Sequence, residues 1–154
     1  MKNNNIKNII ILGIFAWDIR CYKITFTLSK KYNVTLIVRL GEDFNNPDVY
    51  KSKRIKIIKI APSLYKKDPL NNILFIIRSL RIALKSNCKI FYIYGIFSLP
   101  IGIIIKIFKK VKIFYDAAEY YAGMEIASNI IYKYFIKITE LIGIRFVEDR
   151  KSVV

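Results

Sequence analysis

The chain has 154 residues, which is enough for one domain with a substantial core and too few for two full domains. Hydrophobic residues make up 54% of it, which excludes a disordered chain, and the absence of histidine excludes a Ser-His-Asp or Cys-His catalytic arrangement. The formal net charge of +16 predicts a strongly positive surface and favours nucleic acid, an anionic membrane face or a phosphate-bearing substrate as partner. A solvated lysine-rich surface without a specific partner is the alternative.

Neither the cysteines nor the N-terminus points to export. Cys21 and Cys88 lack a metal-like spacing, so we expect two small core residues in a reducing cytoplasm and no metal site. The apolar run from Ile9 to Trp17 follows two lysines, as in a signal peptide, but no small-residue cleavage site comes after it. We interpret this run as a first buried strand and its loop.

The first third of the chain has the pattern of a βαβ unit. Asn8–Gly13 is an aliphatic run that predicts a buried strand, and Ile14–Trp17 is the expected loop after it. Asp18 is placed to cap a helix that runs to about Lys31, and Asn33–Arg39 predicts the second strand. The apolar face of this helix is expected at Ile24, Leu28 and Tyr32.

The middle of the chain predicts an edge strand and a long helix. Gly41–Lys53 is polar and is expected to be a loop, and Arg54–Ile60 alternates lysine with isoleucine, as at a sheet edge. Asp68 and Pro69 then start a helix that ends near Lys85. Its core-packing stripe is expected at Leu70, Ile73, Leu74, Ile77, Leu80 and Leu84.

The uncharged run Ile90–Ile105 is shorter than a usual membrane span and is divided by glycine and proline. It predicts a strand at Lys89–Tyr94 and a helix at about Ser98–Lys109, followed by a fifth strand at Val111–Tyr115. Helical spacing continues from about Gly123 to Val147. The element order predicts an α/β fold, a doubly wound, mostly parallel Rossmann-like sheet.

Three segments that follow strands are expected to meet at one rim of this sheet: Phe15–Arg20, Gly95–Ser98 and Asp116–Tyr121. Asp116 and Glu119 either face a cleft there or cap the following helix. Asp18 has the same ambiguity, and Arg20 is suited to a phosphate or to a carboxylate. The glycine-rich signatures of dinucleotide and phosphate loops are absent from the sequence.

Three motifs together resemble one known family. Asp18-Ile19-Arg20 resembles an Asp-x-Arg entry to a first helix, and Leu28 to Thr35 resembles a Leu-x-x-x-Gly-His-x-Val-Thr turn into a second strand. Phe114 to Tyr121, Phe-Tyr-Asp-Ala-Ala-Glu-Tyr-Tyr, is similar to a Val-Tyr-Asp-Ala-His-Glu-Leu-Tyr segment. These motifs resemble the N-terminal domain of retaining glycosyltransferases of family 4, which have the two-domain GT-B fold.

The resemblance implies an acceptor-side domain over residues 1–148. A nucleotide-sugar donor would be a co-substrate bound mainly by a C-terminal domain that is missing from this sequence, with a glycan or lipid-linked acceptor and no further cofactor. Ala118 stands where the family has a histidine, so the catalytic residues stay unassigned, with Asp116 and Glu119 as candidates. The implied substrate-binding residues are Gly13, Phe15, Asp18, Arg20, Tyr94, Gly95 and Tyr120.

The last six residues, 149–154, resemble one frame of a sequencing adapter, so we expect the authentic sequence to end near Glu148. Without a donor domain the chain alone is expected to be inactive. The expected location is the cytoplasm, with peripheral attachment at the inner face of the cell membrane. The alternative function is a non-catalytic basic α/β module that binds an anionic membrane or a protein. Nucleic acid is not expected as a partner, because the aromatic residues follow core periodicity.

Overall fold

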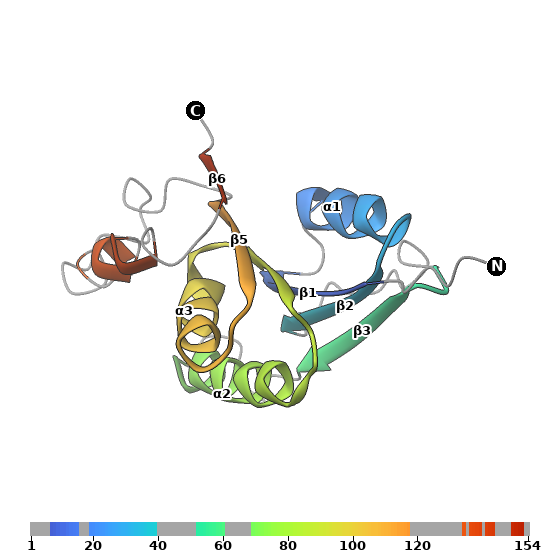
Figure 1. Cartoon of the computed structure of the whole chain (residues 1–154). Coiled ribbons are helices and arrows are strands. Elements are labelled where there is room, and N and C mark those ends of the chain that lie inside the picture. Colours follow the sequence, from blue (N-terminus) through green and yellow to red (C-terminus); the bar gives the residue numbers. More distant parts are fainter. Residues whose placement is uncertain are drawn as a thin grey trace.

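The structure is a computed structural model that describes residues 7–15, 19–39, 52–60, 69–117, 134, 136–139, 141–143 and 149–152. Its centre is a six-stranded sheet in the order β3-β2-β1-β4-β5-β6, and every pairing between neighbours is parallel (Figure 1). The strands are β1 Asn8–Phe15, β2 Asn33–Arg39, β3 Ile55–Ile60, β4 Ile90–Tyr94, β5 Lys112–Ala117 and β6 Asp149–Ser152. The strand order reverses between β1 and β4, which creates the switch point of a doubly wound sheet.

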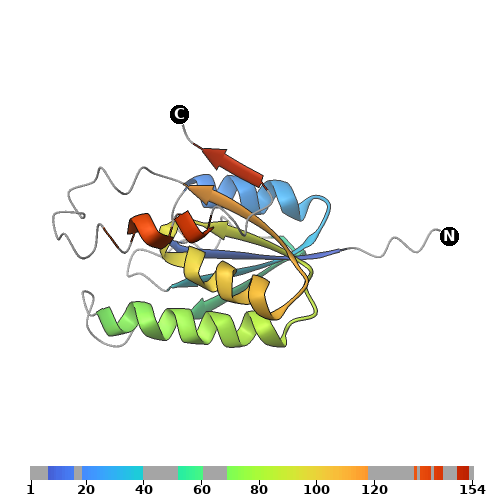
Figure 2. The same ribbon diagram turned by 60° about the vertical axis from the view of Figure 1, so that its left-hand side comes forward.

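Helices cover both faces of the sheet. Helix α1 (Ile19–Ser29) lies on one face, whereas α2 (Pro69–Lys85) and α3 (Leu99–Phe108) lie on the other (Figure 1). A 3-10 turn, η2 (Ile96–Ser98), joins β4 to α3. Figure 2 shows that the strands begin at the end where α2 and α3 finish, and run toward the end where the helices start. The predicted fold class, a doubly wound Rossmann-like sheet, is therefore confirmed.

Each face of the sheet has its own core because neighbouring residues of a strand point to opposite sides. In β1, Ile9 and Ile11 pack on the α1 side, and Ile10 and Leu12 pack on the side of α2 and α3. The expected apolar face of α1 is confirmed, since its residues pack against the first of these cores. Gly102 of α3 allows this helix to lie close to the sheet, because an added Cβ would come within 2.9 Å of Ile93 Cγ1.

The ends of several elements differ from the predictions. Strand β1 continues to Phe15 instead of ending at Gly13, because Phe15 still pairs with Arg39 of β2. Helix α1 ends at Ser29, and α3 begins at Leu99 after the 3-10 turn. By contrast, the predicted bounds of β2 are confirmed, and β3 lies at the edge of the sheet as predicted.

The predicted core-packing stripe of α2 is confirmed at Leu80, which packs against the core, and is wrong at Ile73, Leu74 and Ile77. Ile73 and Ile77 are exposed at 51% and 56%, while Phe75 and Ala83 are fully buried. The physical reason is that α2 carries apolar residues around most of its circumference, so spacing alone does not decide which face meets the sheet. Its buried face is the one that combines the bulk of Phe75 with small residues, Ser79 and Ala83, which allow close approach.

Toward the C-terminus, residues 134, 136–139 and 141–143 are helical, with Ile136 buried in the core and Ile138 exposed. Residues 149–152 form β6, which pairs with β5 from Phe114 to Ala117. The expectations about the origin of residues 149–154 and about the domain boundaries stay predictions. Within the described ranges, no helix is both long and apolar enough to cross a membrane.

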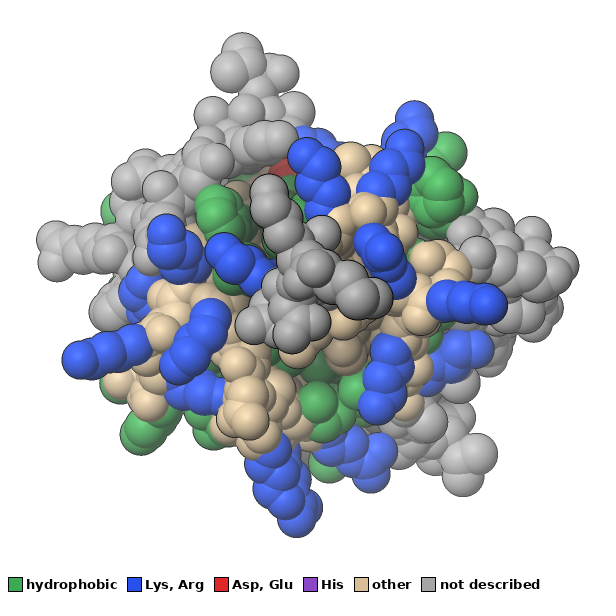
Figure 3. All heavy atoms as spheres, turned by 45° about the vertical axis from the view of Figure 1, so that its right-hand side comes forward, with side chains coloured by type: hydrophobic (Ala, Val, Ile, Leu, Met, Phe, Trp, Pro, Cys, Tyr) green, Lys and Arg blue, Asp and Glu red, His purple; other side chains and the backbone are tan. Residues whose placement is uncertain are grey.

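The described surface is basic. Figure 3 shows a face on which lysine and arginine side chains dominate, with hydrophobic side chains exposed between them. Among the residues whose side chains the structure describes, Asp116 is the only acidic one. The other ten acidic residues of the sequence lie outside this set.

Candidate functional site

Three of the predicted site residues lie in one row across neighbouring strands. Gly13 of β1 pairs with Tyr94 of β4, and Tyr94 pairs with Asp116 of β5. The row lies near the C-terminal ends of these strands, beside the switch point, where open α/β sheets bind their ligands. Asp116 therefore lies at the rim that was predicted for it, and Gly13 and Tyr94, which the resemblance implied as substrate-binding residues, lie in the same row.

Asp116 is part of strand β5, and this corrects two expectations. It was expected to follow the strand, in a loop or as a helix cap, but β5 continues through it to Ala117. Its side chain is only 2% exposed. A carboxylate can remain this deeply buried only if neighbouring groups replace the hydration it has lost.

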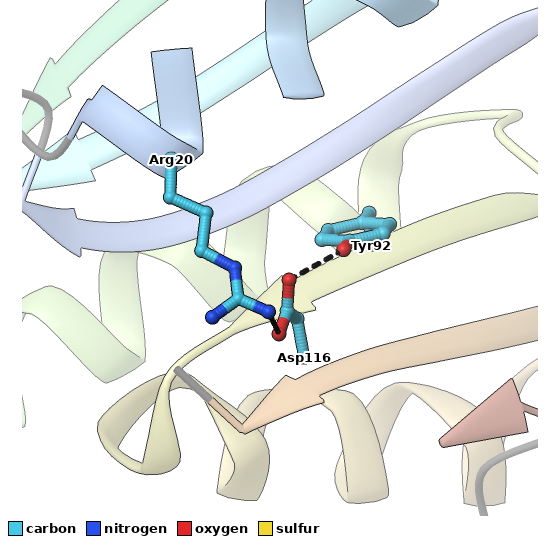
Figure 4. A network of polar contacts seen from close by, with 3 residues as sticks. All are labelled: Arg20, Tyr92 and Asp116. Carbon is cyan, nitrogen blue, oxygen red and sulfur yellow. Dashed lines mark hydrogen bonds and ion pairs between the residues drawn. The ribbon is translucent and has the colours of Figure 1, made fainter. Parts of the chain in front are cut away.

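Two side chains provide this compensation. Arg20, in the first turn of α1, places Nη2 3.1 Å from Asp116 Oδ1, and Tyr92 of β4 donates a hydrogen bond of 2.8 Å to Oδ2 (Figure 4). Figure 4 shows Arg20 reaching from α1 toward the carboxylate while Tyr92 approaches it from β4. One guanidinium and one phenol thus connect α1, β4 and β5 at the same point.

Tyr92 and Arg20, the two partners of Asp116, differ in their electrostatic environment. Burial raises the pKa of Tyr92 well above its ordinary value, and the hydrogen bond to Asp116 and the negative charge of Asp116 raise it further. Tyr92 is therefore a hydrogen-bond donor at neutral pH. The Arg20 side chain is 39% exposed, so it is partly accessible to solvent at the rim of the sheet. Of the three groups, Arg20 is the one suited to meet a ligand.

Gly95 joins this site to helix α3. Its φ of 78° and ψ of 157° lie in a region that is open essentially to glycine alone. With this conformation the chain leaves β4, and the Gly95 N–H donates a 3.0 Å hydrogen bond to the Asp116 carbonyl. The two central strands thus stay connected by backbone beyond the last residue of β4.

Packing does not require glycine at position 13. A Cβ at this position would lie 3.5 Å from Cys21 Sγ and 3.7 Å from Tyr94 Cδ1. These are ordinary contact distances, so an alanine side chain would fit there. Gly13 and Tyr94 are both buried, and any contact of theirs with a substrate stays a prediction.

The structure does not bring all the predicted residues together. Phe15 lies two positions beyond Gly13 at the end of β1, and only its backbone is described. Asp18, Glu119 and Tyr120 lie outside the described residues. The predicted pairing of Asp116 with Glu119 in one cleft therefore stays a prediction.

Two residues of this rim were not predicted. Tyr92 has a phenol in an otherwise aliphatic strand, two positions before Tyr94, which places both side chains on the α1 side; this was the available signal. Arg39 ends β2, and partial burial lowers the pKa of its guanidinium. No group of three metal-ligating side chains comes together in the described part of the chain.

No family model matches the sequence, and no curated protein matches it. Several solved structures are similar to the chain, a sucrose-phosphate synthase and an epimerase among them. Sucrose-phosphate synthase from Thermosynechococcus elongatus has a TM-score of 0.58 at 12% identity, over 85% of this chain and 39% of that one. UDP-N-acetylglucosamine 2-epimerase has a TM-score of 0.61 at 11% identity, over 96% of this chain and 40% of that one.

The chain therefore spans about two fifths of the length of either solved structure. At such low identity the likeness concerns the fold and says nothing about a shared reaction. Together with the all-parallel sheet and its switch point, it establishes a Rossmann-like α/β domain of the GT-B type.

Proposed function

We propose that this chain is the acceptor-side domain of a glycosyltransferase, which moves a sugar from a nucleotide-sugar donor to a glycan or lipid-linked acceptor. The observation that carries the proposal is the Arg20–Asp116 ion pair at the switch point of a GT-B type sheet. The Asp-Ala-Ala-Glu motif that contains Asp116 supports it, as do two structural neighbours whose names describe sugar chemistry. The hexosyltransferase type, the family 4 assignment and the retaining outcome belong to the same proposal.

In this proposal Asp116 is a positioning residue. Its carboxylate is buried and already accepts from Tyr92, so it is poorly placed to transfer a proton to a substrate. It fixes the direction of Arg20, and the guanidinium then donates to hydroxyl or phosphate oxygens of a ligand. Glu119 remains the other candidate for the catalytic group.

Sugar binding tests this role without requiring turnover. Saturation-transfer NMR of the 154-residue chain with a panel of neutral mono- and disaccharides should show transfer to at least one saccharide. Arg20→Gln should reduce that signal about tenfold or more, since a hydrogen bond to a charged group contributes about 1.5–3 kcal/mol. Arg78→Gln, at an exposed position of α2, removes the same charge and should leave the signal unchanged.

Equal signals from the Arg20 and Arg78 variants would refute the assignment of Arg20. The absence of any saccharide signal would count against an acceptor-side domain. We also expect the chain by itself to transfer no sugar, because the resemblance assigns the main donor contacts to a second domain. Robust turnover of a nucleotide-sugar by the purified chain would contradict this expectation.

The alternative, a non-catalytic basic module, is favoured by one observation. Lysines gather at the end of the sheet opposite to Asp116, away from the switch point. Cytoplasmic location and attachment to an anionic membrane face stay predictions, and both functions are compatible with them.

A further inference from the structure

We propose that the end of the domain at which its strands begin is a docking surface for an anionic lipid bilayer. This surface, called the basic end, presents four exposed lysines, Lys7, Lys89, Lys110 and Lys112. Lys106 and Lys109 also line it, but they are half-buried and their ammonium groups donate to backbone carbonyls. The proposal does not depend on the transfer reaction, because it concerns the opposite end of the sheet from Arg20 and Asp116.

Backbone pairing brings these lysines to the same edge. Helix α3 stops at Phe108, and β5 begins at Lys112. The N–H of Lys112 donates a 2.8 Å hydrogen bond to the carbonyl of Lys89, just before β4, and the carbonyl of Lys7, just before β1, accepts a 3.1 Å bond from Asn33. Figure 2 shows the strand starts and the ends of α2 and α3 together at one end of the molecule.

Two adjoining hollows lie at this end. One, of about 600 Å³, is lined by the turn from Lys106 to Lys112. The other, of about 550 Å³, is lined by Lys7, Lys89, Lys110 and Lys112 among others, so the two share a pair of lysines. Acidic headgroups could enter such hollows and meet cations on more than one side.

Two large apolar side chains are exposed in the turn that lines the first of these hollows. Ile107 is 61% exposed and Phe108 is 72% exposed. They face outward because the buried side of α3 is formed by other residues, Ile101 and Ile105 among them. Exposed apolar side chains beside exposed lysines are the combination that interfacial membrane anchors use.

Hydrogen bonds hold this turn in place. Lys106 Nζ donates to the Val111 carbonyl at 2.8 Å, and Lys109 Nζ donates to the Leu84 carbonyl at 3.0 Å and to two further carbonyls at the end of α2. The ends of α2 and α3 are thereby joined. The outward direction of Ile107 and Phe108 is therefore built into the fold and does not require ordering on binding.

Charge selects the partner. The described carboxylate, Asp116, pairs with Tyr94 near the C-terminal end of β5, away from the basic end. Nucleic acid would also be attracted by the lysines, but phosphate contacts give no role to an exposed aliphatic side chain such as Ile107. An anionic bilayer uses both the charge and the apolar side chains, so we commit to it.

Vesicle co-sedimentation of the whole chain tests the proposal. The chain should bind vesicles of mixed phosphatidylcholine and phosphatidylglycerol, and it should not bind pure phosphatidylcholine. Lys110→Gln with Lys112→Gln should weaken binding about 30-fold, since each lysine near the surface contributes about a fivefold factor. Ile107→Ser with Phe108→Ser should weaken it about tenfold, and all four positions are exposed, so folding is expected to be retained.

Two control variants make matched changes elsewhere. Lys23→Gln with Arg78→Gln removes two exposed charges, one on α1 and one on α2, and Ile73→Ser with Ile77→Ser removes two exposed isoleucines of α2. Both controls should bind anionic vesicles within about twofold of the unchanged chain. Equal losses in the control and test variants would overturn the location, because binding would then follow overall charge or hydrophobicity.

A fluorescent DNA duplex, added to the vesicle experiment, tests whether nucleic acid competes with the bilayer for the chain. The proposal is overturned if the duplex displaces the chain from vesicles while the serine substitutions at Ile107 and Phe108 leave vesicle binding unchanged. It is also overturned if the chain does not bind anionic vesicles at low salt. Neither result depends on sugar binding, so a failure here is distinguishable from a failure of the proposed transferase function.

Discussion

Removing the positive partner of Asp116 gives the sharpest test of the site. In Arg20→Met, the aliphatic part of the side chain is kept and the guanidinium is lost, which leaves Asp116 buried without the cation 3.1 Å away. The hydrogen bond from Tyr92 remains. We therefore expect a loss of folding stability, and its size can be bracketed from the exposure of the two groups.

An exposed ion pair contributes about 0–1 kcal/mol, whereas leaving one charge of a buried pair unpaired costs about 3–5 kcal/mol. Asp116 is 2% exposed and Arg20 is 39% exposed, so the pair lies between these limits and solvent screens the arginine side. We expect Arg20→Met to lower the free energy of unfolding by about 2 kcal/mol. Urea unfolding followed by far-UV circular dichroism measures this value.

A double-mutant cycle separates the charge effect from lost packing. Asp116→Asn keeps an oxygen that accepts from Tyr92 but removes the charge that Arg20 compensates. Adding it to Arg20→Met should recover about 1 kcal/mol or more, because no unpaired charge is then buried. Arg78→Met, at an exposed position of α2, should cost less than about 0.5 kcal/mol. If Arg20→Met costs no more than Arg78→Met, or if the added Asp116→Asn recovers nothing, the ion pair does not stabilise the fold.

Three further predictions concern other features. Above about pH 10 the unfolded chain loses the proton of Tyr92 while the folded chain keeps it, so the free energy of unfolding should fall as the pH rises. Urea unfolding at about pH 9 and about pH 11 measures this fall, which should be smaller in Tyr92→Phe than in the unchanged chain. Gly95→Ala should lower the free energy of unfolding by about 1–3 kcal/mol, because Gly95 has a φ of 78°. The melting temperature of this variant should be well below that of Gly13→Ala, whose added Cβ meets only ordinary contacts. In chemical denaturation, Phe75→Ala should lower the free energy of unfolding by about 3–5 kcal/mol and Ile77→Ala by less than about 0.5 kcal/mol. The reverse order would mean that the face predicted from the sequence, which contains Ile77, is the buried face of α2.

The strands were predictable because aliphatic runs buried on both faces have few alternatives. Asn33–Arg39 was predicted with its observed bounds, and the lysine alternation of Arg54–Ile60 placed β3 at the edge. The burial of α2 was not predictable, because its exposed Ile73 and Ile77 have the same spacing and hydropathy as a core stripe. Which side of such a helix is buried depends on how closely it can approach the sheet, and spacing does not contain that information.

The candidate site, like the fold, was predictable from the sequence only in part. The sequence placed Asp116 at a rim formed where central parallel strands end, whereas Gly13 and Tyr94, which share its row, came from the resemblance. It did not predict that Asp116 is buried inside β5, since a carboxylate normally ends an apolar run. The partners that make its burial possible, Arg20 and Tyr92, come from other elements, and only the folded chain brings them together.

The hydrogen bond from the Gly95 N–H to the Asp116 carbonyl has a consequence for how this fold can diverge. The ends of β4 and β5 are connected there by main-chain atoms, which every amino-acid sequence possesses. Only the glycine conformation must be retained for this connection. Side chains around it can therefore be exchanged without displacing the strands that carry them, so the same scaffold can acquire new ligand preferences through single substitutions at its rim.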